Sequence, residues 1–334
     1  MSQVRTLNDV AKIANVSPST VSRILNGTAV VSIEKRKVVE EAIAALGYRP
    51  NVMAQGLAKG RSMIVGVVTQ AISSPFYAAT FVGIEQGLEN TGYHPMFISG
   101  HWRADEEREA VDILTARRAD ALIILGGHLE DAYIHKIAQS VAVVTVGRKV
   151  LGLEPQGIAI DQIEGASIGM RHLLQLGHRR IAHITGPMTH RDSTERLQGY
   201  KNALAEYNVA FDPDLVLEGD FQERSGLLAT EQLLAKRTDI SAIFCANDQT
   251  AVGARLALYR RGIRVPEDIS LVGFDDLFAS SFTTPPLTTV HHPGEDMGIA
   301  AAKMVLALLE DRRPAPALFS PTLVVRESTA RLRF

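Results

Sequence analysis

The feature that most constrains the fold is an alternation of short apolar runs with longer amphipathic segments, extending from residue 62 to residue 290. The apolar runs are rich in β-branched residues and lie at 64–68, 96–98, 121–125, 141–146, 158–160, 181–184, 242–246, 269–274 and 287–290. The amphipathic segments between them include 77–90, 106–115, 165–176, 194–207 and 249–260. Strands that alternate with helices predict parallel sheets covered on both faces. The strands are too numerous for one modest sheet, so we expect two α/β lobes.

Parallel sheets bind ligands beyond the carboxyl ends of their strands, and two facing lobes form a cleft there. The residues that follow the predicted strands are 73–76, 100–102, 147–148, 161, 186–196, 247–248 and 275–276. Groups that can pair with vicinal hydroxyls occur among them at Asp161, Arg196, Asn247, Asp248 and Asp275, and aromatic rings that can cover a pyranose occur at Phe76, Trp102 and Phe221. Together they predict a sugar site, although each residue alone could equally cap a helix or form a salt bridge between domains.

The first 50 residues predict three short helices. Thr6 and Asp9 form a capping-box pattern, and Ser17 precedes Pro18 as an N-cap precedes the first helical residue. Ser32 is placed to cap a third helix over residues 33–46, with Val38, Val39, Ala42, Ile43 and Leu46 on its apolar side. Gly47 is placed to end it.

Two of these helices, separated by a tight turn, match the arrangement that places a second helix in the DNA major groove. In the second helix, about residues 18–25, Val21, Ile24 and Leu25 are available for packing. Its polar residues are free for base edges or phosphates: Ser19, Thr20, Ser22 and Arg23. The pattern alone is equally compatible with a small helical bundle that has an ordinary solvated face.

The charge is distributed unevenly along the chain. Residues 1–61 carry nine Lys or Arg against four Asp or Glu, whereas the remainder carries 26 basic and 33 acidic residues. A basic head on an acidic body indicates that the N-terminal helices meet a polyanion.

Other classes of protein find little support. The one cysteine, Cys245, lies in an apolar run, which predicts a buried thiol, excludes an intrachain disulfide and favours a reducing cytoplasm. We expect no signal peptide and no membrane segment, because neither apolar pattern occurs. The histidines have no metal-site spacing, and no nucleophile elbow, P-loop or dinucleotide fingerprint is present, so we expect no metal, no cofactor and no catalytic residue. The basic cluster at 178–180 is expected to form a solvated turn.

Specific motifs run through nearly the whole chain. In the head they are LNDVA at 7–11, VSPSTVSRILN at 16–26 and GYRPN at 47–51, followed by Ala54, Gln55 and Leu57. In the body they are GHRRIA at 177–182, RLQGY at 196–200, AND at 246–248, DISLVGFDD at 268–276 and PLTTV at 286–290. In this order and spacing they resemble the lac repressor/galactose repressor family of bacterial transcription regulators.

The resemblance implies an N-terminal all-α helix-turn-helix head plus an α/β two-lobed sensor similar to type I periplasmic binding proteins. It implies a DNA-binding domain at 1–50, a hinge at 51–61 and an effector-binding and dimerisation domain at 62–334. The N-lobe would comprise about 62–160 and 291–320, and the C-lobe about 161–290 and 321–334. The expected protein is a cytoplasmic homodimer, not an enzyme, that binds double-stranded operator DNA, represses a carbohydrate-utilisation operon and responds to a small sugar effector.

The resemblance also implies individual roles. DNA contacts are expected at Leu7, Ser17, Ser19, Thr20, Ser22, Arg23, Asn26, Tyr48, Asn51, Gln55 and Leu57. Effector contacts are expected at Phe76, Asp192, Arg196, Phe221, Asn247 and Asp275. The hinge is expected to become helical only on DNA, where Leu57 inserts into the minor groove.

The sequence departs from the family pattern at three positions and at its end. Pro18 stands where many relatives have a base-reading side chain, Gly56 raises the cost of ordering the hinge by about 1 kcal/mol, and Gly147 replaces an acidic residue of several sugar-sensing relatives. No leucine heptads precede Phe334, so nothing supports a coiled-coil tetramer.

Four alternatives remain at this point. A sugar-binding transport protein and an α/β enzyme such as a sugar kinase or dehydrogenase share the predicted body. An activator, or a family member with a non-sugar corepressor, shares the whole predicted architecture.

Overall fold

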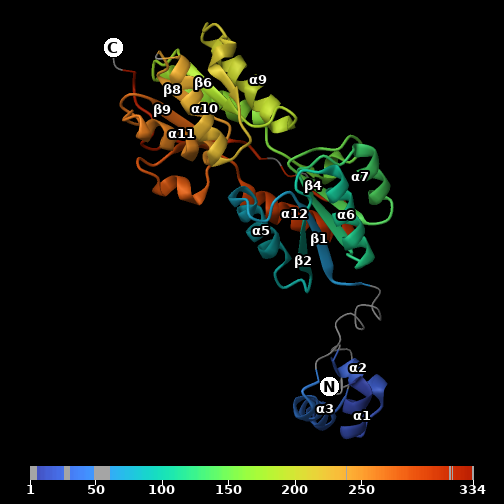
Figure 1. Ribbon diagram of the computed structural model, residues 1–334. Coiled ribbons are helices and arrows are strands. Elements are labelled where there is room, and N and C mark those ends of the chain that lie inside the picture. The colour runs from blue at the N-terminus through green and yellow to red at the C-terminus, as the bar shows by residue number, and fades with distance from the viewer. Residues whose placement is uncertain are drawn as a thin grey trace. The chain divides into compact units, whose positions relative to one another are not determined.

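The computed structural model describes residues 6–25, 31–48, 61–237, 239–315, 317 and 319–332. The chain divides into two compact units, residues 1–63 and 64–334. The helices of the smaller unit and the two sheets of the larger one confirm the predicted fold class, and Figure 1 labels their elements. Among the residues described, none of the helices has both the length and the apolar character that crossing a membrane requires.

In the smaller unit, the described residues form α1 (Leu7–Ile13), α2 (Pro18–Leu25) and α3 (Ile33–Leu46). The expected caps are present. Thr6 and Asp9 exchange both hydrogen bonds of a capping box, Thr20 N–H donates to Ser17 Oγ over 3.1 Å, and Gly47 ends α3 with a φ of +59°. These local signals explain why the helices begin and end where they do.

A small apolar core holds these helices together. Its buried members are Val10, Ala11, Ala14, Val21, Ile24, Val39 and Ala42. The prediction for Val38 was wrong, because its side chain is 43% exposed. Val39, Ala42, Ile43 and Leu46 already complete the i, i+3, i+4, i+7 stripe of α3, and Val38 lies about 100° away from Val39 around the helix.

The N-lobe of the larger unit is built on a parallel sheet in the order β2-β1-β3-β4-β5. The strands are β1 (Ile64–Thr69), β2 (His94–Ser99), β3 (Ala121–Leu125), β4 (Ala142–Val146) and β5 (Gly157–Ile158). The helices are α5 (Pro75–Leu88), α6 (Ala104–Ala116), α7 (Asp131–Ala138) and α12 (Gly294–Leu309). Helices α5 and α12 pack together on one face of the sheet, and α6 and α7 cover the other (Figure 1).

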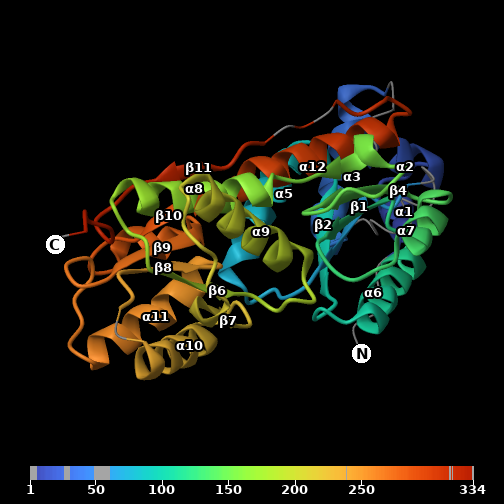
Figure 2. The same ribbon diagram turned by 90° about the horizontal axis from the view of Figure 1, so that it is seen from above.

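The C-lobe sheet has the order β11-β10-β9-β8-β6-β7, with only the β11 pairing antiparallel. Its strands are β6 (Ile181–Thr185), β7 (Val216–Glu218), β8 (Ala242–Cys245), β9 (Ser270–Asp275), β10 (Thr288–His291) and β11 (Thr322–Val324). Its helices are α8 (Gln162–Gln175), α9 (Arg191–Glu206), α10 (Glu223–Lys236) and α11 (Asp248–Arg260). Figure 2 shows α8 and α9 on one side of this sheet and α10 and α11 on the other. Strands β7 and β11 were not predicted, because each is an edge strand of only three residues.

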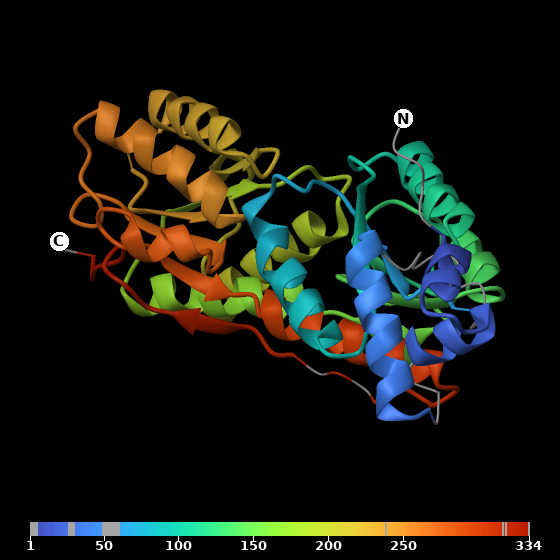
Figure 3. The ribbon, with the colours of Figure 1, turned by 90° about the horizontal axis from the view of Figure 1, so that it is seen from below.

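Three crossovers join the lobes. The chain passes from β5 to α8, from β10 to α12, and from α12 back to β11. Figure 3 shows the last passage as the dark red segment that returns towards the C-lobe. Ile160 and Phe319 form a parallel bridge where two of the crossovers meet. Crossovers that lie side by side allow the lobes to change their angle without breaking either sheet.

The structure corrects the prediction of a solvated turn at residues 178–180. His178 is buried, with Nδ1 3.0 Å from Ser241 Oγ and Nε2 3.0 Å from the carbonyl oxygen of Ala330. Arg180 forms ion pairs with Asp212 and Asp239. His178 therefore helps to hold the C-terminal segment, and Arg180 joins two loops of the C-lobe, through contacts too distant in sequence for a local pattern to reveal.

Candidate functional site

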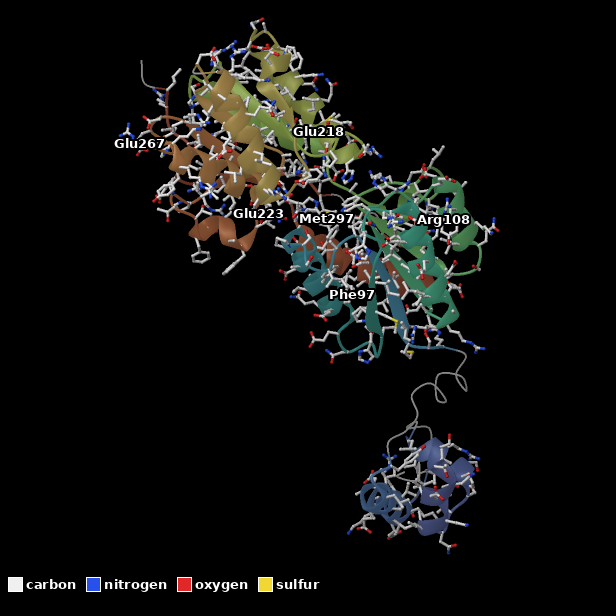
Figure 4. The ribbon with its side chains drawn as sticks, in the orientation of Figure 1. Phe97, Arg108, Glu218, Glu223, Glu267 and Met297 are labelled. Atoms are coloured by element: carbon white, nitrogen blue, oxygen red, sulfur yellow. The ribbon has the colours of Figure 1, made fainter. Side chains whose placement is uncertain are left out.

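A cavity of about 590 Å³ lies between the two lobes, at the carboxyl ends of their parallel strands. Figure 4 shows Met297, one of its lining residues, at the junction of the lobes, with Glu223 on the C-lobe side. All the residues predicted to contact an effector line this cavity: Phe76, Asp192, Arg196, Phe221, Asn247 and Asp275. The fold thus brings together side chains that are up to 199 positions apart in the sequence.

Arg196 is the most firmly held of these side chains. It projects from α9 and is buried, with Nε donating to Gln162 Oε1 over 2.9 Å and Nη1 donating to the carbonyl oxygen of Ala246. Its guanidinium carbon lies 3.7 Å from the centroid of the Phe274 ring, in a cation–π contact. These contacts fix the plane of the guanidinium and leave Nη2 facing Asp275 Oδ1 at 3.9 Å.

Two carboxyls stand beside Arg196: Asp275 is buried, and Asp192 is half-buried. Burial raises the pKa of Asp275 well above its usual range, Arg196 opposes this shift, and Asp248 and Asp192 add to it. Burial likewise raises the pKa of Asp192, again opposed by Arg196. Within the described part of the chain Asp275 Oδ1 accepts no hydrogen bond, and the residue has a φ of +112°, in a region that favours glycine. A buried acceptor that has an ion-pair partner but no hydrogen bond, on a strained backbone, indicates a binding role.

Asn247 serves partly as a positioning residue. Its Oδ1 accepts a hydrogen bond from Thr250 N–H at the start of α11, and its Nδ2 donates to the carbonyl oxygen of Phe221 over 3.0 Å. Phe221 has a φ of +65°, so this bond helps to hold a loop conformation that the residue rarely adopts. The Phe221 ring is thereby directed at the cavity, 5.9 Å from the Arg196 guanidinium carbon.

Two carboxyls from the same sequence pattern do not line the cavity. Asp161 is exposed and caps α8 by accepting from Glu164 N–H over 2.9 Å. Asp248 is buried, and its carboxylate accepts hydrogen bonds from Leu277 N, Ser280 Oγ and Thr289 Oγ1. Burial raises the pKa of Asp248 to about 6, and these hydrogen bonds limit the rise. Asp161 and Asp248 therefore have structural roles, which the sequence left open as the alternative to ligand binding.

An aromatic cluster closes one end of the cavity and joins the lobes. The Trp102 ring of the N-lobe stacks on the His190 ring of the C-lobe, with centroids 4.2 Å apart and planes inclined by 29°. His128 lies 5.7 Å from Trp102, and Phe221 lies 5.8 Å from His190. Trp102 was singled out in the sequence as a post-strand aromatic residue, whereas nothing in the sequence marked His128.

Buried polar groups behind this cluster hold it in place. Gln70 Oε1 accepts a hydrogen bond from Trp102 N–H over 2.9 Å, and its Nε2 donates to the carbonyl oxygen of Leu125. The buried carboxylate of Glu107 accepts from the N–H groups of His128 and Leu129. Neither residue is marked by the sequence pattern. Glu107 in particular is one of three acids in the first turn of an amphipathic helix, and in the sequence it resembles a solvated one.

A second group of aromatic rings lines the cavity. The rings of Phe76 and His292 are 4.9 Å apart, and Tyr77 packs against Phe76. Burial, together with Arg196, lowers the pKa of His292 to about 3, so the imidazole is neutral at physiological pH. His292 directly follows β10, so its position after a predicted strand could have identified it as a candidate site residue.

In the smaller unit, three of the residues predicted to contact DNA cluster around the start of α2. Ser17 Oγ lies 2.8 Å from both Ser19 Oγ and Thr20 Oγ1, and Arg23 is exposed on the same helix. Ser22 is half-buried, and Leu7 and Tyr48 pack partly buried against the three-helix core. Four predicted contacts lie outside the described residues: Asn26, Asn51, Gln55 and Leu57.

The chemistry of the cavity is that of binding. It presents buried carboxyls, a fixed guanidinium, an amide and aromatic rings, the groups that recognise hydroxyls and the apolar faces of sugar rings. In the ranges that the structure covers, no cluster of three His, Cys, Asp or Glu side chains is arranged to hold a metal ion.

Comparison with known proteins assigns both units. Residues 6–51 match the family model described as bacterial regulatory proteins, lacI family, and residues 170–329 match that of the periplasmic binding protein-like domain. The chain is 38% identical to the HTH-type transcriptional regulator GalR of Escherichia coli (strain K12), over 97% of this chain and 96% of GalR. It is similar to the lac repressor dimer bound to operator and the anti-inducer ONPF, with a TM-score of 0.88 and 31% identity over 98% of this chain and 100% of that one. It is also similar to the transcriptional regulator CelR in its cellobiose complex, with a TM-score of 0.73 and 34% identity over 97% of this chain and 99% of that one.

Proposed function

The chain belongs to the lacI family of bacterial regulatory proteins, and we infer from this membership that it is a DNA-binding transcriptional repressor whose cleft binds a carbohydrate effector. The repressor acts as a homodimer on operator DNA and controls genes of carbohydrate use. The lacI family consists of transcriptional regulators, so we expect the cleft to bind its ligand without converting it chemically. A cytoplasmic location fits a head that must reach chromosomal DNA. It also fits a chain whose single cysteine is buried as a free thiol.

The effector proposal depends on one observation: Asp192, Arg196 and Asp275 converge in one cavity that is also lined by aromatic rings. Carboxyl and guanidinium groups pair with neighbouring hydroxyls, and the aromatic rings cover the C–H faces of a sugar. We propose that these three residues contact the effector directly, with Phe76 and Phe221 packing against it and Asn247 contacting it while holding Phe221.

For the head, we propose that α2 enters the major groove. Ser17, Ser19, Thr20 and Ser22 contact phosphates or base edges, and Arg23 reads a guanine. Leu7, at the start of α1, adds a contact that the family resemblance implies. Asn26, Tyr48, Asn51 and Gln55 add contacts that the family resemblance implies.

Apolar side chains exposed on the C-lobe support the homodimer. Leu228 on α10 and Val252, Leu256 and Tyr259 on α11 are all exposed, although these two helices pack closely against each other. Large exposed apolar residues on adjacent helices are typical of a protein interface.

We propose that the hinge at residues 51–61 couples the two sites. A short segment with Gly56 is marginal as a helix, so it folds only when the dimer holds two copies at the right separation on DNA. Leu57 then inserts into the minor groove. The effector changes the angle between the lobes, and hence that separation, which shifts the population between DNA-binding and released states.

A gel shift on the DNA upstream of the protein's own gene tests this function. The protein should retard that DNA at nanomolar concentration, and a cognate sugar should release it. Retention of the complex with every sugar would contradict the inducer role, and tighter binding with one compound would instead identify a corepressor.

A further inference from the structure

On the N-lobe side of the cleft, three glycines leave the backbone without side chains, and we call this surface the glycine floor. Gly126 and Gly127 follow β3, and Gly147 follows the neighbouring strand β4. All three have positive φ, of +61°, +89° and +87°. Gly126 and Gly147 line the cavity. A Cβ built on Gly147 would meet nothing closer than the backbone of Gly126, at 3.7 Å. The space above Gly147 is therefore open, and the backbone conformation keeps it free of a side chain.

Trp102 stands at the edge of this glycine floor. A Cβ built on Gly126 would lie 3.4 Å from Tyr77 Oη and 3.5 Å from Cη2 of Trp102. Gly126 thus lies between the side chains of Tyr77 and Trp102, which are close neighbours across it. Gln70 and Glu107 support the floor from behind: a Cβ on Gly127 would overlap both of their side chains.

Polar groups that can pair with hydroxyls line both walls of the cavity. Asp192, Arg196, Asn247 and Asp275 come from the C-lobe, whereas Asp131, Arg148 and Lys149 come from the N-lobe, beside the glycine floor. The glycine backbone itself adds little hydrogen bonding, because Gly126 N–H donates to Val146 O and Gly147 N–H to Ile158 O. One sugar ring bound by the C-lobe groups leaves the glycine floor and its charged neighbours uncovered.

The cavity is larger than one ring requires. A pyranose has twelve heavy atoms, and bonded atoms pack more closely than separate waters of about 30 Å³ each, so one pyranose fills less than about 360 Å³. A cavity of about 590 Å³ therefore leaves room for a second ring.

We propose that the effector is a glycoside of at least two rings. This inference rests on the proposed carbohydrate-sensing function. One ring binds at Asp192, Arg196 and Asp275, and the next lies on the glycine floor with its apolar face against Trp102. Gly147 and Trp102 are then the residues that distinguish a disaccharide from its component monosaccharides.

Isothermal titration of the full-length protein with matched sugars tests the proposal. The probes are glucose, galactose, mannose, xylose and fructose, together with the α- and β-linked disaccharides built from them. At least one disaccharide should bind ten-fold or more tightly than each of its components, and should change the fluorescence of Trp102, the single tryptophan of the chain. Equal affinity for a monosaccharide and its disaccharides would overturn the two-ring inference and leave the sugar-sensing function standing. Binding of no carbohydrate would overturn both.

Two variants test where the second ring lies. Gly147→Asn fills the floor with a residue that tolerates positive φ, and Trp102→Ala removes the aromatic edge. Each should reduce the disaccharide-to-monosaccharide affinity ratio at least ten-fold. Gly262→Asn is the matched control, because Gly262 also has a positive φ, of +70°, and has nothing within 4 Å of a built Cβ. That control should keep the ratio. A ratio unchanged in both cleft variants would overturn the placement on the glycine floor.

Discussion

Asp275→Asn separates the two opposing effects of a buried carboxyl in the cleft. The Asn amide has the shape of the carboxyl, but it has one acceptor oxygen instead of two and carries no charge beside Arg196. Loss of effector hydrogen bonds at this position should cost about 1–3 kcal/mol, equal to a roughly 5- to 150-fold weaker dissociation constant. Operator binding should be retained, and release by sugar should need a correspondingly higher concentration.

The same substitution should change stability in the opposite direction. The pKa of Asp275 is raised in the folded state, so its contribution to stability is present below about pH 4 and is lost as pH rises through the folded pKa. Asn does not titrate. The unfolding free energy of the variant should therefore equal or exceed that of the wild type at pH 7, and its relative advantage should shrink towards pH 4.

Calorimetry for the effector and urea unfolding at pH 4, 5, 6 and 7 measure these two effects. Asp161→Asn is the matched control, because Asp161 follows a strand but caps α8 outside the cavity, and Asn caps equally well. It should leave effector affinity within two-fold of the wild type. Unchanged affinity in Asp275→Asn would refute the placement of the effector, and an advantage that grows towards pH 4 would refute the raised pKa.

Four further substitutions address the head, the hinge and the core. Arg23→Ala should weaken operator binding by about 1–3 kcal/mol and relax preference at one base pair per half-site; an equal loss on every DNA sequence would mean that Arg23 contacts only phosphate. Leu57→Ala should abolish DNA bending in a circular-permutation gel assay and leave sugar binding intact, whereas Gly56→Ala should tighten operator binding by up to about 1 kcal/mol; unchanged operator affinity in Leu57→Ala would exclude the minor-groove insertion. Burial lowers the pKa of His183 to about 4, so its contribution to stability is present above about pH 6.5 and is lost as pH falls to 4. Relative to His183→Phe, the wild type should lose about 3 kcal/mol of unfolding free energy over this range, and a constant difference in urea unfolding would contradict this.

The sequence was informative where local rules decide the outcome. Caps and turn residues located α1, α2 and α3, and the β-branched runs located most strands of both sheets. The rule that binding residues follow parallel strands selected Arg196 and Asp275 before any contact between them was known.

The same rule could not tell which way a side chain points. Asp275 and Asp248 both lie at the ends of apolar strands, yet Asp275 lines the cavity and Asp248 is directed into a buried network with Ser280 and Thr289. The unusual φ of Asp275 decides its orientation, and that angle depends on the surrounding loop. His190 was similarly beyond local rules, because its stacking on Trp102 appears only when the two lobes face each other.

Reciprocal titration measures the coupling between the effector cleft and the operator. Effector affinity is measured by calorimetry on the free protein and on the protein saturated with operator DNA, and operator affinity is measured with and without saturating effector. Linkage requires the two ratios to be the same, and we expect each ligand to weaken the other by an equal factor of about 5- to 150-fold. An effector that binds free and operator-bound protein with equal affinity would show that the two sites are not coupled.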